Sequence, residues 1–153
     1  NPNLLYARAM AYEELREIKL MEKDLITVLL IDEKNANTLN ALGYSLTVHT
    51  QRYDEAYKLI YQAHLYDPGS AAILDSLGWV EYKRGNYVDA LKFIEASYER
   101  DKDKEIVLHY CKILIKNKSY DKLKNIIYLE LNRNSDDASF TEKLNLINNE
   151  IPL

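Results

Sequence analysis

The stretch Ala71–Ala90, AAILDSLGWVEYKRGNYVDA, decides the fold of this chain. Two helical patterns meet in it at a turn centred on Gly85, a residue that readily adopts the backbone that ends a helix. The plan of this stretch occurs earlier in the chain as well, since Tyr53 and Tyr87 lie 34 positions apart. A period of about 34 residues built from helical patterns is typical of a helical solenoid and not of a single globule.

The same register extends in both directions along the chain. Ala9 lies 34 positions before Gly43, and Tyr120 lies 33 positions after Tyr87. The β-branched residues follow helical spacing, so we expect an all-α fold without strands. The predicted helix pairs span residues 3–15 with 18–31, 36–49 with 53–66, 70–84 with 87–100, and 104–117 with 120–132.

Apolar residues at helical spacing also follow the last pair. We expect a capping helix over about 138–150, because the open end of a helical array needs a cover. Since the chain begins at Asn1 and not at a Met, we interpret it as one domain cut from a longer protein. The single domain 1–153 is then divided into repeats over about 2–35, 36–70, 71–103 and 104–137.

Small residues recur where two helices of a pair must approach closely. Gly43 and Gly78 hold this place on first helices, and Ala56 and Ala90 hold it on second helices. The resulting pattern, L-x2-LG…G-x-Y-x2-A-x3-I…DP, resembles the tetratricopeptide repeat. The resemblance implies a right-handed superhelical α-solenoid whose first helices line a concave groove, and it is closest in the second and third repeats.

A narrower resemblance covers nearly the whole chain. The strings LLYARAMAYEEL, NTLNALGYSL, RYDEAYKLIYQA, AAILDSLGWVEYKRGNY and EIVLHY are similar to the C-terminal repeats of the proteobacterial outer-membrane lipoprotein tetratricopeptide family. This resemblance implies an adaptor that presents envelope substrates to a periplasmic carboxyl-terminal processing protease, and a periplasmic, outer-membrane-anchored location. The run YCKILI after His109 departs from the family pattern. Without the resemblance the compartment is open, and a cytoplasmic protein is the alternative. The matching residues are Arg8, Asn40, Gly43, Tyr44, Asp75, Ser76, Gly78, Trp79, Tyr82 and His109.

The groove that the repeat implies supplies the candidate binding residues. Aromatic side chains offer large contact areas with few rotatable bonds, and Asn or Asp can hydrogen-bond the main chain of a bound segment. Trp79 directly follows Gly78 and is therefore expected to face away from the helix–helix contact. We expect a protein or peptide partner at Tyr6, Met10, Asn37, Asn40, Tyr44, Asp75, Trp79 and Tyr82.

Structural roles compete with binding at several of these positions. The chain has 13 tyrosines, and any one of them can instead pack between helices. Ser76 is expected to bond back to its own helix, and Asp75 could pair with Lys83 or Arg84. A clamp for a C-terminal carboxylate needs several cations in the groove, where we expect only Lys112.

Several classes of function are disfavoured. The net charge of −4 argues against nucleic acid, and no apolar run approaches the length of a membrane span. His49, His64 and His109 fall in separate helices, so a metal site lacks its local scaffold. No nucleotide-binding or nucleophile motif is present, and we predict no catalytic residue, no cofactor and no enzyme. The single cysteine, Cys111, is expected to be a small buried residue.

We therefore predict a non-catalytic interaction scaffold or adaptor that holds a partner polypeptide in its groove. The alternative is a structural spacer or a self-associating module, a homo-oligomer, that positions upstream domains.

Overall fold

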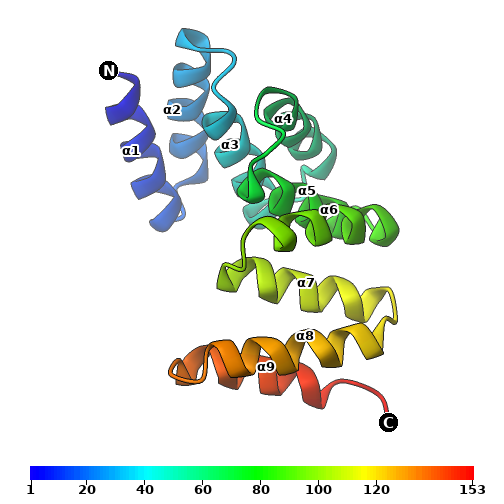
Figure 1. The fold of residues 1–153 in the computed structure, drawn as a ribbon. Coiled ribbons are helices and arrows are strands. Elements are labelled where there is room, and N and C mark those ends of the chain that lie inside the picture. Colours follow the sequence, from blue (N-terminus) through cyan, green and yellow to red (C-terminus); the bar gives the residue numbers. More distant parts are fainter.

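The computed structural model describes residues 1–153 and consists of nine α-helices without a strand. None of these helices has the length and apolar character that a membrane span requires. Figure 1 shows the helices stacked in chain order, from an upright first pair to a last group that runs across the molecule. They are α1 (Pro2–Glu14), α2 (Ile18–Ile31), α3 (Ala36–His49), α4 (Tyr53–Tyr66), α5 (Ala71–Lys83), α6 (Tyr87–Arg100), α7 (Lys104–Lys116), α8 (Tyr120–Arg133) and α9 (Ala138–Asn149).

Short polar side chains fix where several helices begin. The side chains of Asn35, Ser70 and Asp137 accept hydrogen bonds from backbone N–H groups in the first turns of α3, α5 and α9. These caps satisfy donors that have no partner within the helix. The all-helical fold with a terminal capping helix is confirmed, and the predicted helix bounds agree with the observed ones to within one or two residues.

A left-handed residue joins the two helices of three pairs. Gly85 has a φ of 83°, as the glycine-centred turn predicted, and Arg16 and Lys118 adopt φ values of 59° and 56° at the same place in the first and last pairs. At each of these turns the N–H of the left-handed residue donates to the carbonyl three residues earlier, which closes the end of the helix. The turn is therefore kept where the glycine is absent.

The small residues lie where α3 meets α4 and where α5 meets α6. Ala56 and Ala90 are fully buried. A Cβ added to Gly43 would lie 2.9 Å from the carbonyl oxygen of Ala56, and one added to Gly78 would lie 3.3 Å from that of Ala90. The predicted close approach of the two helices in each pair is thus present, and it is tighter at Gly43 than at Gly78.

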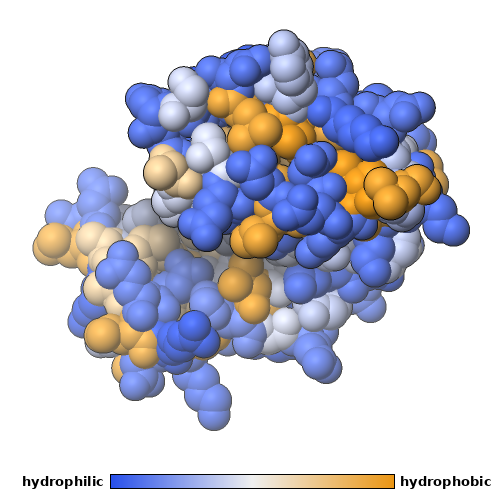
Figure 2. All heavy atoms as spheres, turned by 90° about the horizontal axis from the view of Figure 1, so that it is seen from below, coloured by the Kyte–Doolittle hydropathy of each residue, from blue (hydrophilic) through white to orange (hydrophobic).

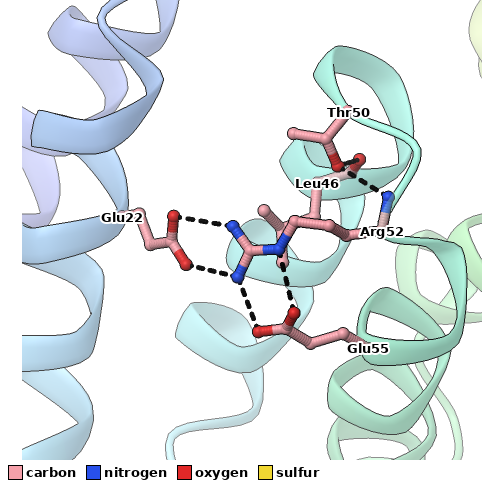
Figure 3. Close-up of polar contacts among 5 residues, drawn as sticks. All are labelled: Glu22, Leu46, Thr50, Arg52 and Glu55. Carbon is pink, nitrogen blue, oxygen red and sulfur yellow. Dashed lines mark hydrogen bonds and ion pairs between the residues drawn. The ribbon is translucent and has the colours of Figure 1, made fainter.

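Arginine side chains in two of the turns connect the second repeat to the first and the third to the second. The guanidinium of Arg52 lies between the carboxylates of Glu22 on α2 and Glu55 on α4, with N–O distances of 2.7 to 3.0 Å (Figure 3). Arg84 repeats the contact with Asp54 at 3.0 Å. In both cases the partner on the preceding repeat lies 30 positions earlier. This bridge adds to the apolar contacts that stack the repeats.

The buried apolar residues form two clusters that meet at α5 and α6. The first runs from Ala9 to Val80 and the second from Ala90 to Ile147. The capping helix α9 contributes Phe140 and Leu144 to the second cluster, so it covers the end of the array as expected. Figure 2 views the molecule from this end and shows apolar patches between hydrophilic side chains. Leu129 on α8 and Leu146 on α9 are among the exposed apolar residues of the chain.

Candidate functional site: an acidic groove on the inner face

The inner face of the array contains a cavity of about 430 Å³. Helices α1, α3 and α5 form three of its walls, and the segment from Asp101 to Ile106, at the junction of α6 and α7, forms the fourth. Six of the predicted binding residues line it: Tyr6, Met10, Asn37, Asn40, Tyr44 and Asp75. The helical period alone places them together, because they occupy one face of three stacked first helices.

Tyr44 lies at the centre of the α3 wall. Its hydroxyl group donates a hydrogen bond to the carboxylate of Glu105, 61 residues later in the chain, and so connects α3 to α7 across the groove. Burial raises the pKa of the Tyr44 hydroxyl, and the Glu105 carboxylate raises it further. The hydroxyl therefore stays protonated, and the tyrosine ring is held at one position in the wall.

One residue of the α3 wall has an unused hydrogen-bonding atom. The side-chain oxygen of Asn40 is buried and has no hydrogen-bond partner in the protein. Buried polar atoms are nearly always paired, and an unpaired one costs free energy. Because Asn40 lines the cavity, a donor on a bound molecule could supply the missing hydrogen bond.

Asp75 forms the α5 wall together with the serine that follows it. Its carboxylate oxygen lies 2.8 Å from Nδ1 of His109, and both residues are buried. Burial raises the pKa of Asp75, and the contact with His109 opposes that shift. The alternative pairing of Asp75 with Lys83 or Arg84 is wrong, because Arg84 instead binds Glu81 and Asp54.

The prediction for Ser76 is confirmed. Its hydroxyl donates to the carbonyl of Ala72 on its own helix, at 3.0 Å.

Trp79 and Tyr82 do not line the cavity. The Trp79 side chain is 8% exposed, and its ring stacks between the rings of His109 and Tyr82, with centroid distances of 4.1 and 4.6 Å. The position after the packing glycine points toward α7, and the next repeat covers it. The sequence could not reveal this, since it depends on how far α7 lies over α5.

The lining of the cavity is strongly acidic. Glu13, Asp101, Asp103 and Glu105 line it together with Asp75, and none of its 15 lining residues is Lys or Arg. Asp101 and Asp103 lie outside the first helices, whose periodic positions predicted the groove residues. The one feature of the sequence that could have indicated their role in the groove is their place in the charged run between two helices.

The arrangement of helix pairs is similar to that of solved tetratricopeptide-repeat structures. TTC0263, a thermophilic TPR protein of Thermus thermophilus, superimposes with a TM-score of 0.85 over 96% of this chain and 81% of that one, at 14% identity. The chain folds as a tetratricopeptide-repeat array. The second TPR domain of human RPAP3, solved in complex with an HSP70 peptide, gives a TM-score of 0.64 at 19% identity over 74% of this chain and 98% of that domain.

A sequence relative of this tetratricopeptide-repeat array is also known. The TPR repeat-containing protein PA4667 of Pseudomonas aeruginosa is 44% identical over 107 residues, which are 70% of this chain. The match covers 18% of that relative's length, so this array corresponds to a small part of it. No family model matches the sequence. The predicted repeat type is confirmed, while the lipoprotein adaptor family stays a prediction.

Proposed function

We propose that this array holds a segment of a partner protein in its concave groove and acts as an interaction scaffold. The observation that carries the proposal is the cavity of about 430 Å³ into which α1, α3 and α5 together direct aromatic and amide side chains. A cavity of this size suits a few side chains of an extended or helical segment.

The wall residues suit that task chemically. Tyr6 and Tyr44 are half-buried and present ring surface, which contributes strongly to binding while little side-chain entropy is lost. The unpaired oxygen of Asn40 can accept a hydrogen bond from a backbone or side-chain N–H. Peptide binding by the structurally similar RPAP3 domain supports the proposal by analogy of fold.

The most direct test uses substitutions on the groove and outside it. A partner captured from the source cell is purified, and its affinity is measured by calorimetry for the wild type, for Tyr44→Ala and for Tyr128→Ala. Tyr128 is the matched control because it is 66% exposed on α8 and outside the cavity. We expect Tyr44→Ala to weaken binding by about thirtyfold, the loss typical of a central aromatic contact, and Tyr128→Ala to leave it unchanged.

Equal affinities of the wild type and Tyr44→Ala, with unchanged circular dichroism, would refute the groove proposal. Trp79→Ala is a poor probe, because it removes a buried ring that stacks on two others and so disturbs the fold.

We further propose that the array serves in the bacterial envelope, as part of an adaptor for a carboxyl-terminal processing protease. The support is the resemblance of its repeats to the outer-membrane lipoprotein family. The test is to fractionate source cells and to read the N-terminus of the whole protein. A lipoprotein signal with its acylated cysteine supports this location, and a protein found in the cytoplasm contradicts it.

Self-association is the second candidate function, and one observation favours it. The outer face of α2 exposes Ile26, Leu30 and Ile31, with exposed fractions of 43%, 82% and 60%. Exposed apolar side chains grouped in this way often mark interfaces. Light scattering of the wild type and of Leu30→Glu tests it: a dimer that the substitution dissociates supports self-association, and a monomer at all concentrations contradicts it.

A further inference from the structure

We infer that the segment held in the groove is positively charged, with Lys or Arg side chains entering the cavity. The inference rests on the proposed function and adds the chemistry of the partner. Five carboxylates line the cavity, those of Glu13, Asp75, Asp101, Asp103 and Glu105. No Lys or Arg nitrogen lies within 4.0 Å of any of them, although such pairs occur elsewhere in the chain.

The segment 101–105 shows how acids and lysines are separated at this wall of the cavity. Residues 101–105 read DKDKE, so acids and lysines alternate in the wall. The three acids line the cavity, whereas Lys102 donates to the carbonyl of Tyr98 and Lys104 pairs with Asp137. The lysines of this segment therefore bind other parts of the protein and leave the carboxylates of the cavity without a Lys or Arg partner. Histidines are their basic neighbours: His49 lies 3.3 Å from Glu13, and His109 lies 2.8 Å from Asp75 and 3.9 Å from Glu105.

A second observation points to a donor from outside. Asn40 lines the same cavity, and its side-chain oxygen is buried and has no donor in the protein. A guanidinium or ammonium group carries several N–H donors and no acceptor, so it can serve both an amide oxygen and a carboxylate. The nearby faces of Tyr6 and Tyr44 also attract cations.

Other ligands fit this cavity less well. No three His, Cys, Asp or Glu side chains are grouped closely enough to hold a metal ion. A peptide like the one bound to RPAP3, SGPTIEEVD, carries acidic residues, which the carboxylates here would repel. Negative charge in a concave site also raises the rate at which a positively charged segment arrives.

The experiment uses three display libraries of peptides about a dozen residues long. They share the same apolar content and carry a surplus of Lys and Arg, no net charge, or a surplus of Asp and Glu. We expect the basic library to be enriched over the acidic one by at least about tenfold, and its binding to weaken as NaCl is raised to about 0.5 M.

Charge-removing variants connect this selectivity to the groove. The triple variant Asp101→Asn, Asp103→Asn, Glu105→Gln keeps the shape of each side chain and one of its two acceptor oxygens. The control Asp32→Asn, Asp121→Asn, Glu142→Gln removes equal charge from exposed positions outside the cavity. We expect the groove variant to lose about tenfold or more in affinity for selected basic peptides, at about twofold to fivefold per charge, and the control to bind like the wild type.

The outcomes separate this inference from the proposed function. If neutral peptides bind as well as basic ones and Tyr44→Ala loses them, the groove binds peptides but the charge inference is wrong. If the groove variant and the wild type bind basic peptides with equal affinity, the charge inference is also wrong, while peptide binding by the groove stands. If no library yields a peptide that binds the wild type, both proposals fail.

Discussion

Replacing Gly43 by alanine should destabilise the array, whereas the same change at its counterpart Gly78 should be nearly neutral. An added Cβ at Gly43 would lie 2.5 Å from Cγ1 of Ile60 and 2.9 Å from the carbonyl oxygen of Ala56. At Gly78 the nearest atoms belong to Ile94, both at 3.2 Å. The two positions are equivalent in the repeat, so a difference in stability between the two variants reports how closely the second helix packs against each glycine.

The magnitudes follow from two opposing effects. Alanine in place of glycine within a helix gains about 1 kcal/mol in helix propensity. Overpacking costs about 1–3 kcal/mol, with the upper part of that range expected at Gly43 because a backbone carbonyl cannot rotate away. We therefore expect Gly43→Ala to lower the free energy of unfolding by about 1–2 kcal/mol and Gly78→Ala to change it by less than about 1 kcal/mol.

Urea unfolding followed by far-ultraviolet circular dichroism measures both changes. Gly69→Ala is the control, because a Cβ there meets no atom within 4 Å and the backbone has an ordinary φ. The free energy of unfolding of Gly69→Ala should equal that of the wild type or be slightly higher. An unfolding midpoint of Gly43→Ala at or above that of Gly78→Ala would refute the view that the α3–α4 contact is the tighter one.

Three further predictions concern the thiol and two ion pairs. Burial raises the pKa of Cys111 to about 12, so Ellman's reagent at pH 8 should label it only as the protein unfolds; rapid labelling of folded protein would contradict its burial. Arg52→Gln should lower the free energy of unfolding by about 0.5–1 kcal/mol at low salt by removing the partly exposed pair with Glu22, and a loss undiminished at high salt would count against this cause. Arg8 lowers the pKa of Asp24, so this pair stabilises the folded protein above the unfolded-state pKa of an aspartate, and the stabilisation is lost as pH falls through the lower folded-state pKa. Asp24→Asn should therefore flatten the curve of unfolding free energy against pH in that window. An unchanged curve would exclude the pair as the cause of this pH dependence.

The helices were predictable because the period and the turn residues agree. Tyr53–Tyr66 and Tyr87–Arg100 begin and end where the pattern predicts, each after a turn or short polar segment. The turns at Arg16 and Lys118 were less predictable, because a residue with a Cβ adopts positive φ at a cost. The register of neighbouring repeats overrides that local preference, so the fourth pair keeps the plan of the third without its glycine.

The candidate site was predictable only as far as the helical period determines it. Tyr6, Asn40 and Tyr44 lie on the inner faces of first helices, and the cavity contains them. Trp79 has the same periodic position, but α7 covers it through His109. The wall at Asp101 depends on the path of a loop, which the period does not specify.

The fourth repeat contributes to the groove although its sequence departs from the resemblance. The departure begins at Tyr110, and the residues that follow, including Cys111 and Leu114, are buried in the second apolar cluster, where different apolar side chains can fill the same space. The residues of α7 that reach the groove precede it: Glu105 accepts the hydrogen bond of Tyr44, and His109 binds Asp75. Divergence in the interior of this repeat therefore leaves its groove contacts in place. A truncation that removes α7 would take Glu105 and Ile106 out of one wall of the cavity.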